Sequence, residues 1–360
     1  MRRLNILVLS AVLLMFLTQT AAIADTGTET QEEITLQQAV DQALEMSRSL
    51  KISELEKDTA KEEREDAQDQ VSYTPIGEIN DDIKNAYITL LQKELGYQTS
   101  IKNVEALERD IMVEVVEKYA AIYSARADLE DAEAGLEDAE YDRNIAQKKL
   151  QVGIVAQYEL DEANSNLVQK ETALKDAQSN LEQAYEDFNI LLGNSVDERP
   201  ILVSSIEYPE PEVTSIDAEV SRALNNSTDV WSALKQITLA EVNLRTSDSY
   251  EISKINIKIA ELNASEAKKA LETSVREKLD SMESLRNQII STETSIKDAE
   301  AALNRAEKKY AIGTGTQSDV VQAKVDLTSQ ENQLAGLRLE LASSMASYNR
   351  LTGRDILPEE

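Results

Sequence analysis

The chain carries the stretch "KKLQVGIVAQYELDEANSNL" at residues 148–167, in which a single glycine, Gly153, interrupts a long helical pattern. A similar stretch, "KKYAIGTGTQSDVVQAKVDL", stands at residues 308–327, with Gly313 in the same place, 160 residues further on. Glycine adopts the left-handed backbone that ends a helix at no steric cost. Both stretches therefore predict the tight tip of an αα-hairpin.

The hairpin tips belong to a longer internal repeat. Residues 116–193 align with 276–353 without a gap, and residues 36–50 align with 216–230 at a shift of 180. The first copy thus holds 20 more residues, the difference between the two shifts. We predict a first helical repeat at 25–192, a linker at 193–215, a second repeat at 216–353 and a tail at 354–360. The linker holds three of the five prolines and is expected to contain one short strand within 201–206.

Each copy shows a helical pattern of apolar and small residues spaced alternately three and four apart. The outgoing pattern runs from Ile122 to Leu150 and again from Met282 to Tyr310, and a returning pattern runs from Leu160 to Leu191. Heptad spacing predicts left-handed coiled-coil packing. The expected fold class is all-α, with long coiled-coil hairpins in two pseudo-repeats and helices of about 40 residues, or about 60 Å.

The start of each returning helix differs between the copies. Thr316 and Asp319 form the pattern of a capping box, whereas Ala156 with Glu159 predicts a weaker cap. The segment 126–143 is dense in Asp and Glu. It is either a solvated helix face or part of a negatively charged lumen that favours cations.

Composition excludes several functions. The formal net charge is −30, which disfavours binding to nucleic acid. Cysteine and histidine are both absent from the sequence, which removes disulfides, thiolate or imidazole metal sites and Ser-His or Cys-His catalysis. We expect no enzyme activity, no catalytic residue, no cofactor and no metal site.

The first 24 residues have the pattern of a secretory signal peptide. Arg2 and Arg3 precede an apolar run from Leu4 to Leu17, and a small-residue cleavage site ends at Ala24. The alternative is an uncleaved membrane anchor, for which the apolar run is short. No later segment has the 18 consecutive apolar residues of a membrane span. We expect an exported protein of the cell envelope, on the periplasmic, outer-membrane or wall side.

The paired tips, the repeat and the export signal together resemble the TolC-type outer-membrane efflux family. The resemblance is carried by the tip motifs at 152–167 and 312–327 and by the helix endings "LLG" at 191–193 and "LTG" at 351–353. It covers most of residues 34–357. It implies a homotrimer whose hairpins close a twelve-helix tube. The tips would form the entrance and contact the hairpin of a periplasmic adaptor protein, which links the tube to an inner-membrane transporter. Substrates would pass through without chemistry.

The resemblance also implies roles for residues at the tips. Asp319 would narrow the channel entrance, Glu159 is the matching acid of the first tip, and Gln322 stands where family members place a second constriction acid. Gly315 stands where some members carry an arginine that latches the closed entrance. The tip residues expected to contact the adaptor are Val152, Gly153, Ile154, Ile312, Gly313, Thr314, Gly315 and Thr316.

The sequence departs from the family pattern where members insert membrane strands. Residues 234–271 contain neither proline nor glycine, and the isoleucines there fit either a strand or, better, a helix. In the first copy Pro75 and Gly77 predict a turn, followed by a helix with Asn80 or Asp81 as its N-cap. We therefore expect little or no β-barrel. Two functions follow as hypotheses: an efflux conduit, or a structural coiled-coil scaffold or spacer of the envelope derived from such conduits.

Overall fold

The computed structural model describes residues 33–72, 81–206, 208–209, 215–246 and 249–358. The first repeat contains α1 (Leu36–Met46), α2 (Arg48–Ser72), α3 (Asp81–Gln151) and α4 (Gln157–Leu192). The second contains α5 (Ile216–Asn226), α6 (Thr228–Thr246), α7 (Tyr250–Ala311) and α8 (Gln317–Thr352). Two short parallel strands, β1 (Glu33–Ile34) and β2 (Ile201–Leu202), join the N-terminal segment to the linker. The predicted all-α fold with two helical repeats is confirmed.

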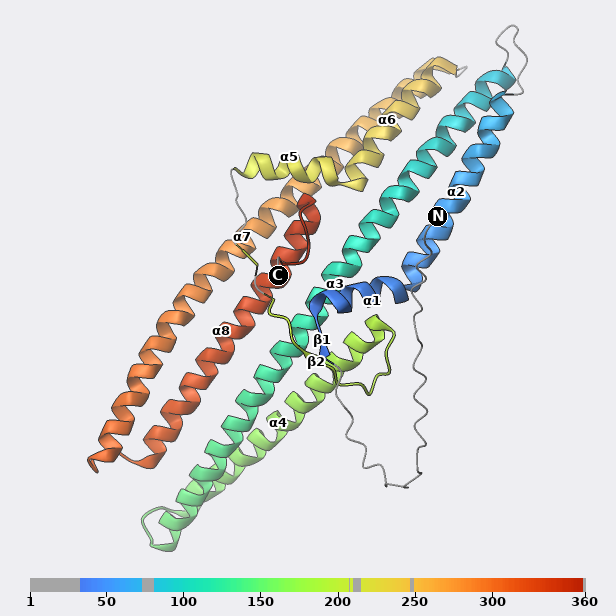
Figure 1. Ribbon diagram of the computed structural model, residues 1–360. Helices are drawn as coiled ribbons and strands as arrows, with labels where there is room; N and C mark the ends of the chain where they lie inside the picture. The colour runs from blue at the N-terminus through green and yellow to red at the C-terminus, as the bar shows by residue number, and fades with distance from the viewer. Residues whose placement is uncertain (1–32, 73–80, 207, 210–214, 247–248, 359–360) are drawn as a thin grey trace, which may run out of the picture.

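The long helices form an elongated layer one helix thick. The helices α3 and α7 run from end to end, with α4 and α8 beside them in one half and α2 and α6 in the other (Figure 1). Helix α3 contacts α2, α4, α6 and α8, whereas α7 contacts α6 and α8. The order across the layer is therefore α4–α3–α8–α7 in the half with the tips and α2–α3–α6–α7 in the other. Helix α7 forms one edge throughout, and α4 with α2 forms the other.

The two outgoing helices are longer than the sequence pattern predicts. The returning helices α4 and α8 have 36 residues each, close to the expected length, but α3 has 71 and α7 has 62. At 1.5 Å per residue both outgoing helices span about 100 Å. The predicted outgoing patterns cover only residues 122–150 of α3 and 282–310 of α7, yet no proline interrupts the rest of either helix, so the hydrogen-bond ladder continues.

Several other expectations can be compared with the structure. Residues 250–271 are helical and open α7, so the helical interpretation of the isoleucine pattern is confirmed and the strand interpretation is wrong. The short strand expected in the linker is present as β2. The signal peptide at 1–24, the turn at Pro75 and Gly77 and the cap at Asn80 lie outside the described residues. None of the described helices combines the length and apolarity that crossing a membrane requires.

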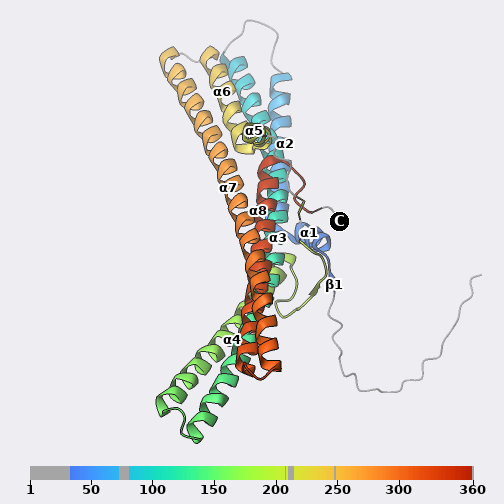
Figure 2. The same cartoon turned by 90° about the vertical axis from the view of Figure 1, so that its left-hand side faces the viewer.

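Two short helices, α1 and α5, lie across the long helices near the middle of the layer. Both lie on the same broad face as the linker, as Figures 1 and 2 show. Thr35 caps α1 through a capping box, and Ser215 caps α5. Both helices are amphipathic, and they bury Val40 and Val220 respectively against the layer. These transverse helices thus give the thin layer a buried core at its middle.

The larger part of this core surrounds Tyr119 and Phe188, which are fully buried and pack edge to face with ring centroids 5.9 Å apart. The Tyr119 hydroxyl donates a hydrogen bond to the Ile34 carbonyl at 3.3 Å and accepts one from the Ser204 amide at 3.0 Å. One aromatic pair therefore joins α3, α4, β1 and the linker.

We predict that Phe188→Ala lowers the free energy of unfolding by about 3–5 kcal/mol, because it leaves a cavity at the centre of this core. Denaturant unfolding of the mature chain measures the change. The control is Gln169→Ala, an exposed position on the same helix, and its change should stay within about 0.5 kcal/mol. Equal effects of the two substitutions would contradict the placement of the core.

Candidate functional site

The two hairpin tips have the same backbone geometry. Gly153 and Gly313 adopt φ angles of 76° and 72°. The Gly313 amide donates to the Tyr310 carbonyl at 3.0 Å, and the next amide donates to the Lys309 carbonyl at 2.9 Å. The first tip repeats both hydrogen bonds at the same positions and nearly the same distances. Each tip is therefore a glycine-dependent helix end of the Schellman type, as the repeat predicts.

The two tips lie at the same end of the molecule (Figure 1), and both expose apolar side chains. Val152, Ile154 and Ile312 are 70%, 73% and 75% exposed. Nothing lies within 4 Å of the positions that Cβ atoms would occupy on Gly153 and Gly313. Large aliphatic side chains clustered at an exposed end are typical of a contact surface for another protein.

The starts of the two returning helices differ as the sequence predicts. The Thr316 hydroxyl accepts a hydrogen bond from the Asp319 amide at 3.2 Å, and the Asp319 carboxylate accepts one from the Thr316 amide at 2.8 Å. Ala156, at the equivalent position of α4, has the same extended backbone but no side-chain cap. The capping box is thus confirmed at the second tip only.

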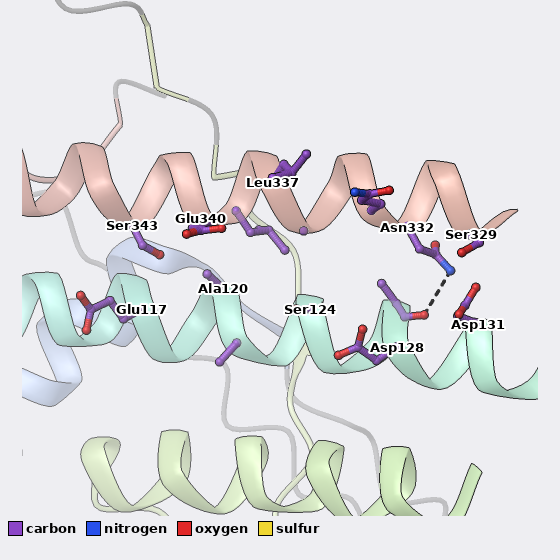
Figure 3. A pocket seen from close by; sticks show the side chains of 15 residues that line it. Glu117, Ala120, Ser124, Asp128, Asp131, Ser329, Asn332, Leu337, Glu340 and Ser343 are labelled. Atoms are coloured by element: carbon purple, nitrogen blue, oxygen red, sulfur yellow. Dashed lines mark hydrogen bonds between the residues drawn. The ribbon is translucent and has the colours of Figure 1, made fainter. Parts of the chain in front are cut away.

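A groove lies between α3 and α8, where the two repeats meet. It has a volume of about 640 Å³ and runs along small residues such as Ala120, Ser124 and Gly336 (Figure 3). Four carboxylates line it, from Glu117, Asp128, Asp131 and Glu340, and none of its lining residues in the described part of the chain is basic. The acidic segment at 126–143 contributes two of these carboxylates. Sequence analysis identified that segment but missed the groove, because pairing of α3 with α8 is a contact between repeats.

Acidic groups continue along the same α3–α8 seam toward the tips. One oxygen of Asp138 is buried without a hydrogen-bond partner. Burial raises the pKa of the Asp138 carboxyl, and the neighbouring Asp142 and Asp326 raise it further, against the opposing effect of Lys170. Asp142 also accepts a hydrogen bond from the Ser318 hydroxyl at 3.3 Å, which joins the second tip to α3. Negative charge is therefore concentrated where the two hairpins meet.

Known proteins are similar to this chain in sequence and in fold. Residues 215–354, which make up the second repeat, match the family model of the outer membrane efflux protein. The second repeat is therefore similar to the outer membrane efflux proteins, the TolC-type family that the tip motifs resemble. No curated protein matches the chain by sequence.

Solved structures of outer-membrane channels share the fold of this chain. The channel OprN has a TM-score of 0.70 at 15% identity, covering 90% of this chain and 91% of its own. The Campylobacter jejuni channel CmeC has a TM-score of 0.69 at 16% identity, covering 96% and 94%. The open state of the Neisseria gonorrhoeae channel MtrE gives 0.65 at 14% identity, covering 90% of each chain. The fold match spans both repeats, including the first one, which the family model does not reach.

At the second tip the chain has no space for an arginine at position 315, the position implied by the resemblance for the latch of some TolC-type proteins. A Cβ atom on Gly315 would lie 2.9 Å from the Cβ of Lys309 and 3.2 Å from two backbone atoms. The Gly315 amide also donates to the Lys309 carbonyl at 3.0 Å. The chain here is folded onto the end of α7, so a side chain would force the tip backbone to move.

The three predicted entrance residues lie near the tips but in different surroundings. The exposed Gln322 donates a hydrogen bond to the Asp326 carboxylate at 2.9 Å. The partly exposed Glu159 lies in the first turn of α4. The exposed Asp319 has a capping role, and its hydrogen bonds from the Thr316 backbone and hydroxyl lower the pKa of its carboxyl. A role in narrowing the entrance stays a prediction for all three residues.

We predict opposite effects for two substitutions at equivalent positions. Thr316→Ala removes a cap and should weaken the first turn of α8 by about 1 kcal/mol, whereas Ala156→Thr should strengthen the first turn of α4, because its third position already carries Glu159. Hydrogen exchange of the amides at 317–320 and 157–160 measures both effects. Equal exchange in the two variants and the parent chain would contradict the assigned caps.

The lowered pKa of Asp319 gives the same cap a pH dependence. The contribution of an ionised carboxylate is fully present above the unfolded value of about 3.9 and is lost as the pH falls through the lower folded value. NMR titration should therefore find that the pKa of the Asp319 carboxyl lies below the usual range for aspartate. In the Thr316→Ala chain its pKa should move up toward the usual value.

Proposed function

We propose that three copies of the chain close into a helical tube that serves as an efflux conduit of the cell envelope. In this proposal the tips meet the helical hairpin of a periplasmic adaptor, which connects the tube to an inner-membrane transporter. The match of the second repeat to the outer membrane efflux protein model supports the efflux role. The observation that supports the assembly is that both edges of the helical layer expose aliphatic side chains in the described part of the chain.

One edge carries an aliphatic stripe on α7. Ile252, Ile255, Ile259 and Leu262 are spaced three, four and three residues apart, and each is more than half exposed. Their neighbours on the opposite side of the helix, such as Ala260 and Ala264, are buried. A heptad stripe of this kind is a coiled-coil seam that lacks its second helix.

The opposite edge carries exposed aliphatic residues on both of its helices. Ile52 and Leu55 on α2 are 57% and 66% exposed, and Val168 and Ile190 on α4 are 59% and 66% exposed. The two edges are different surfaces, so joining one to the other is a heterologous contact, which forms a ring when the rotation closes. Such a ring would cover the apolar residues of both edges with copies of the same chain.

The broad faces of the layer support an assignment of the inside and outside of that ring. The helices α1 and α5 would fill a narrow lumen if they pointed inward, so we place their face outside. The acidic groove lies on the other side of α3 from α1 (Figure 3) and would then line the lumen. Three copies of its four carboxylates would attract cations and disfavour anions.

The tips support the proposed contact with an adaptor. Their exposed aliphatic residues lie at one end of the layer, beyond the helices that would close the ring. A structural scaffold of the envelope is the second candidate function. Export distinguishes the two functions. A conduit has an open lumen, and deletion of the protein should raise the sensitivity of the cell to exported compounds. A scaffold needs no lumen, and its deletion should leave that sensitivity unchanged.

We predict that Ile255→Glu combined with Ile259→Glu converts the mature trimer into monomers. More than half of each side chain is exposed in the single chain, so each isoleucine would contribute about 1–2 kcal/mol when a second copy covers it. Native mass spectrometry measures the state. The control is Val203→Glu, in the linker and 48% exposed, which should leave the trimer intact. A parent chain that remains monomeric at all concentrations would disprove the assembly.

We predict that Gly313→Val weakens capture of the adaptor while the helices persist. Valine is strained at φ 72°, so the tip backbone must change. The tagged chain is cross-linked in its own cells, and adaptor subunits are quantified by mass spectrometry. The control is Gly96→Val inside α3, where nothing lies within 4 Å of the added Cβ. Equal capture by both variants would contradict the tip assignment.

A further inference from the structure

The two repeats present nearly the same docking site for a transverse helix. At the end of α1, Met46 lies beside Gly193, and at the end of α5, Asn226 lies beside Gly353. In each case the Cβ of the helix residue is 3.3 Å from the position of a Cβ on the glycine. The two contacts are related by the same sequence shifts as the repeats, 180 for the helices and 160 for the glycines. The backbone at these two contacts is therefore closely similar in the two repeats.

The interiors of the two sites have opposite chemistry. In the first, Ala39 of α1 and the fully buried Phe188 and Leu192 of α4 form an apolar contact. In the second, the equivalent residues are Glu219 of α5, with Tyr348 and Thr352 of α8, all at most 2% exposed. The contact is apolar in one repeat and built around a buried carboxylate in the other.

The Glu219 carboxylate is fully paired in its own site. It accepts two hydrogen bonds from the Arg354 guanidinium, at 2.6 and 2.9 Å, and one from the Tyr348 hydroxyl at 2.5 Å. Arg354 also donates to the Thr352 hydroxyl at 3.2 Å. Arg354 stands where the first repeat has Asn194. No equivalent of this network can therefore form in the first repeat.

A buried ion pair is weak evidence for stability, because an apolar pair of similar volume is often as stable. A site that holds only one partner of the ion pair is strongly destabilised, since the remaining charge is then buried without compensation. Docking α5 on the first site would place Glu219 against Phe188 and Leu192. Docking α1 on the second site would leave Arg354 without its carboxylate.

We propose that Glu219 and Arg354 form a matching pair that assigns α5 to the α7–α8 hairpin and excludes it from the α3–α4 hairpin of the same chain or a neighbouring one. In a ring closed through its edges, α7 and its attached α5 would lie beside α4 of the next copy, where such an exchange is easiest. The inference itself depends only on the two docking sites and holds for a single chain.

The absence of cysteine from the chain allows a direct test by disulfide trapping. Two double variants report the matched sites, Met46→Cys with Gly193→Cys and Asn226→Cys with Gly353→Cys. Two others report exchange, Asn226→Cys with Gly193→Cys and Met46→Cys with Gly353→Cys. Both glycines have nearly the same φ, 73° and 71°, so backbone strain is equal in the four proteins.

In the otherwise unchanged full-length mature chain, oxidation should trap the matched pairs and not the exchanged ones. An uncompensated buried charge corresponds to a difference of about a hundredfold or more in docking. The exchanged pairs are then tested after Glu219→Ala, Tyr348→Phe, Thr352→Leu and Arg354→Asn, which give the second site the residues of the first. Exchanged disulfides should rise toward the yield of the matched ones. The control background is Ser221→Ala, an exposed position of α5, which should leave exchange absent.

Two results would overturn the proposal. One is substantial trapping of exchanged pairs in the unchanged background, and the other is their continued absence in the four-residue background while matched pairs still form. If the four-residue background does not fold, the exchanged cysteine pairs are tested with the single substitution Glu219→Gln, which removes the charge and retains the volume of the side chain. Exchange must then rise above the unchanged background, and no rise would refute the role of the charge.

Discussion

A layer of helices one helix thick cannot bury both of its faces or either of its edges, and this constraint governs the molecule. The middle is stabilised by α1 and α5, which lie across one face and bury residues such as Val40 and Val220. Within the described residues the edges have no such cover, and α7, α2 and α4 present exposed aliphatic residues there. The protein is therefore expected to complete its packing with further copies of itself.

Sequence reasoning succeeded where a local signal repeats. Gly153 and Gly313 end helices in a left-handed backbone that few other residues adopt, so the hairpins and their positions could be predicted. The capping box at Thr316 and its absence at Ala156 could be predicted for the same reason. Their signals involve residues that are adjacent or three apart, and the repeat doubles each observation.

Contacts between distant segments could not be predicted in this way. The acidic groove requires α3 and α8 to pair across the two repeats, which no local pattern specifies. The matching of Glu219 with Arg354 joins residues 135 positions apart, and in the sequence each appears as an ordinary charged residue. The length of α3 was missed because its heptad pattern begins only at Ile122, well after the start of the helix at Asp81. The role of Asp319 in the capping box differs from the entrance role that its position in the family pattern implies.

In the proposed assembly these features would form a tube wall whose lumen, entrance and outer face differ in chemistry. Carboxylates along the α3–α8 seam give one face its negative charge, exposed aliphatic residues mark the tips, and each transverse helix packs across its own repeat. The most direct test of this account is electron microscopy of the purified mature protein viewed end on. The account predicts threefold rings with an open centre, and images of single rods or of bundles with a filled centre would contradict it.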